Sequence, residues 1–309
     1  MLLIKCVLLC LSCLSLEEKV SRLMLSAYEE GVEVGAVITY GETVPPHPIV
    51  AVDQEGGRVV RFRNGFTPIP SAAELGATYS EEEVYRLFRQ VGSELRRAGI
   101  TINFAPVVDL SQNDRSFGQD PEKVTRYAGA VIDGLLDAGI LPCLKHFVGY
   151  GSASGDAHAA LPTADWDPDA LIPYRHLASW VPMIMTAHLR IPALDPDHCA
   201  TLSPTIVRAL LRGELNFKGV IVTDSLTMHG VLEEAGSLEE AAIQALEAGC
   251  DLLLLGGRAL SGDPFEPLEN ARRVHKAVVE AVHSGRLTES RLDESVERVG
   301  NIYKWLISR

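Results

Sequence analysis

Short apolar runs rich in β-branched residues alternate with longer amphipathic stretches from about residue 20 to the C-terminus. Short buried runs are typical of parallel strands, and amphipathic stretches between them are typical of crossover helices. Eight such runs are present, so the pattern predicts an α/β fold closed into a TIM-type (β/α)8 barrel. The predicted strands cover residues 23–28, 34–39, 48–52, 101–105, 141–145, 183–187, 219–223 and 251–255.

Apolar residues three and four positions apart predict five helices, over residues 81–98, 121–138, 238–248, 267–282 and 289–308. The first has readable ends, because Ser80 precedes three glutamates as an N-cap does and Gly99 is a typical C-terminal stop. Residues 29–33 and 40–47 are too short for crossover helices after the first two strands. We therefore expect the barrel to be irregular or shortened in its N-terminal quarter.

Residues 1–15 form an apolar extension that precedes a single barrel domain over residues 16–309. The extension resembles the apolar part of a signal peptide, but it lacks a small-x-small cleavage site and is too short to span a bilayer. A misassigned start or a barrel-packing extension explains it equally well. We expect a cytoplasmic protein, and a secreted or periplasmic one if residues 1–15 act as a signal peptide.

Charge and cysteine content narrow the classes of function. The 309 residues include 28 Lys and Arg against 41 Asp and Glu, a formal net charge of −13. Such a surface repels phosphates, so neither nucleic acid nor a membrane is an expected partner. The six cysteines lack zinc-site spacing and disulfide density, and no nucleotide-binding motif occurs, so we expect no metal and no cofactor. The sequence leaves the oligomeric state open.

Charged residues repeatedly follow the predicted strands, at the end of a barrel where active sites are built. A structural salt bridge explains any one of them, but burying charge is costly unless it is paired or used. Their repeated placement therefore favours a functional mouth. The residues concerned are Asp53, Asp109, Arg115, Lys145, His146, His188 and Asp224.

The segment KHFVGYGSASGDAHAALP, residues 145–162, carries Asp156 and His158 two positions apart. The carboxylate can accept a hydrogen bond from the imidazole, fix its tautomer and favour its protonated form. Glycine and serine predict a mobile loop here. An isolated Asp-x-His is usually without function, so the pair gains weight only from its context.

Two further segments each leave two interpretations open. In VDQEGGRVVRF, residues 52–62, Asp53 is available as an acceptor for ligand hydroxyls, or it forms a local ion pair with Arg58 in a tight turn. In GVIVTDSLTMHG, residues 219–230, Asp224 is placed to face the barrel mouth as a nucleophile, or it is a helix N-cap.

From about residue 16 onward the chain resembles the single-domain β-N-acetylglucosaminidases of glycoside hydrolase family 3, the β-hexosaminidases of the peptidoglycan-recycling type. The matching stretches stand in the family's order, which makes them far more specific than any single motif. They are LSLEEKV, VDQEGGRV, INFAPVVDL, DRSFGQDP, KHF with GDAHAALP, IMTAH followed by IPALD, ATLSP and GVIVTDSLTM. The chain departs from the pattern where Val148 and Tyr150 replace the Pro and His of KHFPGHG, and where Cys199 replaces the proline before ATLSP.

The resemblance implies a retaining β-N-acetylhexosaminidase that hydrolyses terminal non-reducing β-linked N-acetylglucosamine through a glycosyl-enzyme, with peptidoglycan fragments as the expected source. It implies Asp224 as nucleophile and His158, assisted by Asp156, as general acid/base. The implied sugar-binding residues are Asp53, Arg115, Lys145 and His146, while His188 and Asp109 belong to the site wall. A family 3 β-glucosidase or β-xylosidase, a glycoside phosphorylase and a noncatalytic sugar-binding barrel are the alternatives, and the natural leaving group stays open.

Overall fold

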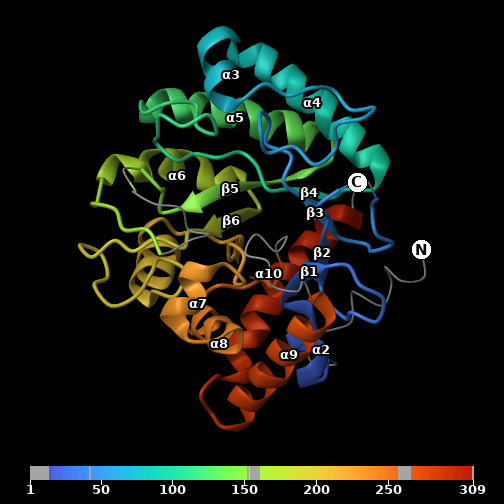
Figure 1. The fold of residues 1–309 in the computed structure, drawn as a ribbon, viewed down its shortest axis with the longest axis vertical. Helices are drawn as coiled ribbons and strands as arrows, with labels where there is room; N and C mark the ends of the chain where they lie inside the picture. The colour runs from blue at the N-terminus through green and yellow to red at the C-terminus, as the bar shows by residue number, and fades with distance from the viewer. Residues whose placement is uncertain (1–13, 42, 152, 154–160, 257–265, 308–309) are drawn as a thin grey trace.

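The computed structural model describes residues 14–41, 43–151, 153, 161–256 and 266–307, and its eight strands form one parallel sheet (Figure 1). Their order is β7-β6-β5-β4-β3-β2-β1-β8. The strands are β1 (Met24–Ala27), β2 (Ala36–Ile38), β3 (Val50–Val52), β4 (Ile102–Asn103), β5 (Leu141–Phe147), β6 (Met183–Thr186), β7 (Val220–Val222) and β8 (Leu253–Leu254).

The sheet closes on itself where β7 meets β8. A parallel bridge joins Val222 to Leu252, and the Thr223 N–H donates to the Leu252 carbonyl at 3.0 Å. All eight predicted strands are therefore present, and the predicted (β/α)8 barrel is confirmed. β5 continues two residues beyond its predicted end, to Phe147.

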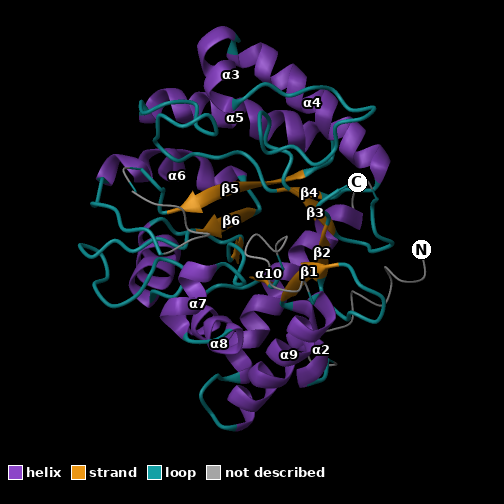
Figure 2. Cartoon of the chain, in the orientation of Figure 1, coloured by secondary structure: helices purple, strands orange, loops and turns teal. Residues whose placement is uncertain are grey.

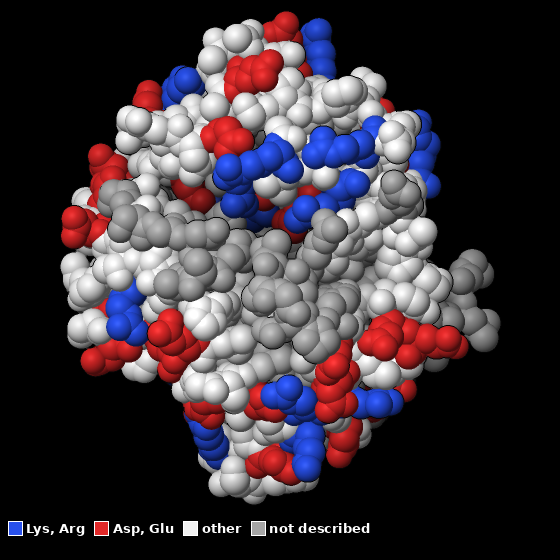
Figure 3. All heavy atoms as spheres, in the orientation of Figure 1, with Lys and Arg blue, Asp and Glu red and all other residues white. Residues whose placement is uncertain are grey.

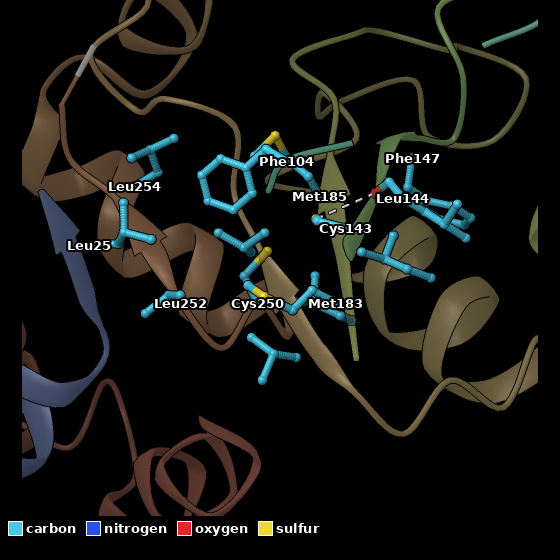
Figure 4. Packing of buried hydrophobic residues seen from close by; sticks show 14 of the residues in the cluster. Leu25, Phe104, Cys143, Leu144, Phe147, Met183, Met185, Cys250, Leu252 and Leu254 are labelled. Carbon is cyan, nitrogen blue, oxygen red and sulfur yellow. Dashed lines mark hydrogen bonds between the residues drawn. The ribbon is translucent and has the colours of Figure 1, made fainter. Parts of the chain in front are cut away.

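The barrel interior is packed with side chains. Every residue of the eight strands is buried, as parallel strands between a filled interior and covering helices require. Figure 4 shows side chains from several strands meeting in this interior, with Phe104, Cys143 and Cys250 among them. Cys143, Cys199 and Cys250 are buried free thiols.

Helices cover the outside of the barrel, with α4 and α5 on one side and α7, α8 and α9 on the opposite side (Figure 2). The longer helices are α2 (Leu16–Arg22), α3 (Ala72–Thr78), α4 (Glu81–Ala98), α5 (Pro121–Asp137), α6 (Ile172–Leu177), η4 (Thr205–Glu214), α7 (His229–Ala235), α8 (Leu238–Ala248), α9 (Pro267–His283) and α10 (Glu289–Ile307). Two short turns, η2 (Pro168–Leu171) and η3 (Ala178–Trp180), flank α6.

The predicted ends of α4 are confirmed. The Ser80 side chain accepts from the Glu83 N–H and the Glu83 side chain accepts from Ser80, while Gly99 ends the helix in the left-handed conformation. α4 then packs closely on α5, because a Cβ at Gly134 would lie 2.6 Å from the Tyr85 carbonyl oxygen. This pair of helices forms a rigid wall behind β4 and β5.

The first quarter of the barrel is irregular, as predicted. No helix lies in the described parts of the β1–β2 and β2–β3 connections. Instead, α10 lies across the N-terminal ends of strands that are far apart in sequence. Its Tyr303 hydroxyl donates to the Gly35 carbonyl beside β2, and its Arg298 contacts Asp251 before β8. α10 thus forms the floor of the barrel.

The surface charge is unevenly distributed. On the face in Figure 3, a band of Lys and Arg side chains crosses the upper half, while Lys and Arg are mixed with Asp and Glu in the lower half. Within the described ranges, no helix is both long and apolar enough to cross a membrane.

Candidate active site

Lys145 is the centre of a charged cluster at the C-terminal ends of β3, β4 and β5. Its ammonium lies 2.7 Å from Asp53 Oδ1 and 2.6 Å from Glu55 Oε1, and its side chain is only 2% exposed. Burial alone would lower the pKa of Lys145, but Asp53 and Glu55 outweigh burial and raise it. Lys145 is therefore a buried cation held by two carboxylates.

Arg115, in the loop after β4, binds the same Glu55. Its Nε and Nη2 atoms donate to the two carboxylate oxygens, each at 2.8 Å, in the bidentate geometry that guanidinium groups favour. Burial would raise the pKa of Glu55, but Lys145 and Arg115 lower it to about 2. Glu55 is thus an anion at neutral pH, and the Arg115 side chain stays 30% exposed towards the mouth.

His146 is oriented by Asp109. The imidazole Nδ1 lies 2.8 Å from Asp109 Oδ2, and the backbone N–H groups of His146 and Tyr150 donate to Asp109 Oδ1. Since the carboxylate accepts from Nδ1–H, the ring presents Nε2 to Arg115 Nη2 at 3.4 Å. Burial would raise the pKa of Asp109, but His146 and the hydrogen bonds lower it.

Asp224 follows β7 and is partly exposed, with the Ser225 N–H donating to its Oδ1 at 2.7 Å. Burial would raise the pKa of Asp224, but His188, His146, the Ser225 N–H and Lys145 together lower it. An ionised carboxylate at a barrel mouth suits a nucleophile. The N-cap interpretation is wrong, because the next helix begins at His229 with Met228 as its cap residue.

His188 holds the backbone beside Asp224. Its two ring nitrogens lie 2.9 Å from Thr201 Oγ1 and 2.9 Å from the Ser225 carbonyl oxygen, and the residue is fully buried. Burial lowers the pKa of His188, although the Asp224 charge opposes this shift. His188 is therefore a rigid wall residue, in keeping with the place expected for it.

Asp53 does not form the alternative ion pair with Arg58. Arg58 pairs with Asp114 at 3.4 Å, while Asp53 contacts Lys145 and lies 3.7 Å from Arg61 Nη2. The predicted residues Asp53, Arg115, Lys145, His146 and Asp224 therefore share one mouth.

Comparisons with known proteins assign the chain to a family. Residues 18–302 match the model described as the glycosyl hydrolase family 3 N terminal domain. The chain belongs to glycosyl hydrolase family 3. The predicted family and the prediction of a glycoside hydrolase are thereby confirmed.

Named relatives within family 3 agree with this assignment. Beta-hexosaminidase LpqI of Mycobacterium tuberculosis is 38% identical over 276 residues, which cover 83% of this chain and 68% of the relative. A family 3 member from Mycobacterium smegmatis superposes with a TM-score of 0.85 at 33% identity, covering 95% of this chain and 98% of that one. A β-N-acetylglucosaminidase from Paenibacillus superposes with a TM-score of 0.84 at 32% identity, covering 96% and 63%.

Three residues of this family 3 site escaped the sequence prediction, namely Glu55, Arg61 and Tyr150. A signal for Glu55 was present, because a lysine buried at a strand end needs carboxylates and Glu55 stands two residues after Asp53. Arg61 lies over the Tyr40 ring, 5.9 Å from its centroid. The Tyr150 ring meets the His146 ring edge-on at 5.2 Å, and its buried hydroxyl has no hydrogen-bond partner among the described residues.

The predicted acid/base pair, Asp156 and His158, lies outside the described residues. The same holds for most of the loop that carries the pair. Among the residues that the structure does describe, no group of three or more metal-ligating side chains gathers.

Proposed function

We propose that the protein is a retaining β-N-acetylhexosaminidase that hydrolyses terminal non-reducing β-linked N-acetylglucosamine. The observation that carries this proposal is Asp224, a partly exposed carboxylate with a lowered pKa beside the Lys145 and His146 cluster, in a family 3 barrel. Relatives that bear the name β-hexosaminidase support the choice of sugar.

In the proposed reaction, Asp224 attacks the anomeric carbon and forms a glycosyl-enzyme. Its lowered pKa keeps the carboxylate ionised, which the attack requires. Asp53 and the exposed part of Arg115 are placed to bind sugar hydroxyls, and His146 presents Nε2 towards the same space. Lys145 donates to Asp53 Oδ1 and so orients the Asp53 carboxylate.

The reaction also needs a proton donor for the leaving oxygen and a base for water in the second step. We assign both roles to His158, with Asp156 fixing its tautomer and favouring its protonated form. This assignment is supported by the sequence and by the pairing of the other carboxylates in the mouth cluster, since Asp53 and Glu55 contact Lys145 and Asp109 contacts His146.

We further propose that the substrate is a peptidoglycan fragment with terminal β-linked N-acetylglucosamine and that the enzyme acts in the cytoplasm. The free buried thiols and the net charge of −13 are compatible with a reducing compartment.

The specificity is tested with 4-nitrophenyl β-glycosides that differ only at the 2-position. We expect the N-acetylglucosaminide to exceed the glucoside in kcat/KM by at least about a hundredfold, because polar contacts to the amide are lost with the glucoside. Equal rates would support a β-glucosidase, and a phosphate-dependent sugar phosphate product would support a phosphorylase. Binding of the N-acetylglucosaminide without release of nitrophenol would support a noncatalytic protein.

The stereochemistry is tested by NMR. If the enzyme is retaining, the first sugar product should have the β configuration.

The acid/base assignment is tested with His158→Ala. Substrates with poor leaving groups should lose far more activity than nitrophenyl glycosides, because nitrophenolate leaves without protonation. The glycosyl-enzyme should accumulate, and azide should restore its release. The control His176→Ala removes an exposed histidine on α6 and should change neither the activity on any of these substrates nor the release of the glycosyl-enzyme. Equal losses for all substrates without azide rescue would contradict the assignment.

The role of Asp156 is tested separately with Asp156→Asn. Without the anionic partner the pKa of His158 falls, so the basic limb of the pH–rate profile should move to lower pH. An unchanged profile would remove Asp156 from the mechanism.

A further inference from the structure

A second charged cavity, of about 690 Å3, lies at the end of the barrel opposite the mouth. Lys218 stands just before β7 and Gly249 just before β8, whereas Asp224 follows β7 at the other end. η4, the end of α8 and the first turns of α10 complete its walls. Its basic lining residues are Arg208, Arg212, Lys218, Arg286, Arg291 and Arg298.

Three of these side chains converge on one buried carboxylate, that of Asp251. Arg298 Nη1 lies 2.9 Å from Asp251 Oδ1, Arg291 Nη2 lies 3.7 Å from the same oxygen, and Arg212 contacts Oδ2. Burial lowers the pKa of Arg212 and of Arg291; Asp251 opposes the shift, but the neighbouring guanidinium groups add to it. One anion therefore does not neutralise its surroundings.

Two more cations stand at the exposed rim. Arg208 donates to the backbone carbonyl of Glu247, and within the described residues neither Arg208 nor Lys218 has a carboxylate partner. Arg286 differs, because it pairs with Glu240 at 2.6 Å and with Glu247 at 3.0 Å.

The cavity therefore carries an excess of positive charge. Its six basic side chains face four carboxylates, those of Glu240, Glu247, Asp251 and Glu294, in a chain whose formal net charge is −13. The inner arginines have a structural role as well, since Arg212 donates to the Phe217 and Gly219 carbonyls and Arg291 to those of Leu246 and Cys250. Arg208 likewise donates to the Glu247 carbonyl, but within the described residues no carboxylate balances the charge of Arg208 or of Lys218.

We propose that this cavity binds a small multivalent anion of the phosphorylated-metabolite class. Guanidinium groups match the geometry of phosphate oxygens, and the volume lies in the range of small-molecule sites. Bound phosphate would contact Arg208 and Lys218 and offset the repulsion between the buried guanidinium groups. Because only the folded chain assembles these residues, the ligand stabilises the fold. The proposal does not depend on the reaction at the mouth.

The test uses calorimetry and thermal unfolding of the full chain with pyrophosphate and, separately, inorganic phosphate, at an ionic strength held constant with sodium chloride. We expect saturable binding of one pyrophosphate per chain, weaker binding of phosphate, and a Tm that rises with ligand concentration. Binding should be unchanged in Asp224→Ala, which places the ligand away from the mouth.

Matched variants separate a site from diffuse attraction. Arg208→Gln/Lys218→Gln should weaken pyrophosphate binding by at least about tenfold, because both rim contacts are lost. Arg272→Gln/Lys276→Gln removes the same charge from exposed positions on α9 and should leave binding unchanged. If circular dichroism shows that the rim variant does not fold, the single Lys218→Gln variant replaces it. No saturable binding in the wild type, or equal weakening in both double variants, would overturn the proposal.

Discussion

The two ends of the barrel bury charge in opposite ways. At the mouth, Lys145 and Arg115 are matched by Asp53 and Glu55, so the cluster is balanced. At the floor, Arg212, Arg291 and Arg298 surround the one buried carboxylate of Asp251, and among the described residues only Arg298 has a second carboxylate partner, the exposed Glu294. The mouth cluster satisfies its own charges, which leaves Asp224 without a direct ion pair among the described residues.

The difference fits two roles: the mouth holds a reactive carboxylate, whereas the charges at the floor hold structural elements together. A nucleophile that is paired tightly with a cation is a weaker nucleophile, so the positive groups at the mouth act on Asp224 from a distance and lower its pKa. At the floor, direct contact ties β7, β8 and α10 together, and nothing there is free to react.

Asp224→Ala should lower turnover by at least about four orders of magnitude, because the covalent step loses its nucleophile. The Tm should change little, since only the neighbouring Ser225 N–H bonds to this carboxylate among the described residues. Steady-state kinetics and thermal unfolding measure both effects, and Asp169→Ala, at an exposed aspartate on η2, is the control. Turnover near that of the wild type would remove Asp224 from the mechanism.

Asp251→Asn should have the opposite profile. Three partly buried guanidinium groups lose their buried anion, which should lower the free energy of unfolding by about 3 to 5 kcal/mol. Urea unfolding measures the loss, while kcat per folded molecule should be unchanged because the mouth is untouched. A loss below about 1 kcal/mol, the scale of an exposed pair, would show that Asp251 is not the anchor.

Acid should lower the free energy of unfolding through Glu55, which lies in the charged cluster at the mouth. Its pKa is about 2 in the folded protein and lies above 4 in the unfolded chain, so its contribution is present above the unfolded pKa and is lost as the pH falls from about 5 to 2. The contribution is about 3 kcal/mol. Urea unfolding between pH 6 and pH 3 should show a flatter pH dependence in Glu55→Gln than in the wild type. Parallel curves would exclude Glu55 as the acid-sensitive group.

Tyr150→Phe should have the smallest effect. The hydroxyl is buried and unpartnered within the described residues, so its removal should leave the unfolding free energy unchanged or slightly higher. We expect kcat/KM to fall by about tenfold, the worth of one lost hydrogen bond to the substrate. Tyr150→His, which restores the usual family residue, should retain activity. A less stable variant with wild-type kcat/KM would show that the hydroxyl has only a structural role.

Local signals account for the parts of the fold that the sequence predicted. The strands were recognisable because both of their faces are buried, and α4 because its cap residues Ser80 and Gly99 are unambiguous. The helices that were missed are α2, α3, α6, α7 and η4. The four α-helices among them have only six or seven residues each, and η4 has no side chain that caps its start. Their stability depends on packing against the barrel, which no local pattern records.

The site was predicted only in part for a similar reason. Residues at strand ends, such as Lys145 and Asp224, are placed by the strands themselves. Glu55 and Arg61 lie in a loop whose path depends on long-range contacts, because the Gln54 N–H donates to Asn103 Oδ1 and the Asn103 amide donates to the Gln54 carbonyl, 49 positions apart in the sequence. The pairing of Asp156 with His158 stays a prediction, since both lie outside the described residues.

α10, the helix across the floor, also limits how early the barrel can be completed during synthesis. Tyr303 contacts Gly35, 268 positions earlier in the chain, so α10 covers the strands beside Gly35 only after residue 303 has been synthesised. Contacts of such large sequence separation slow folding, and the early strands remain exposed in the meantime. The N-terminal ends of these strands therefore lack the cover of α10 until residue 303 has left the ribosome.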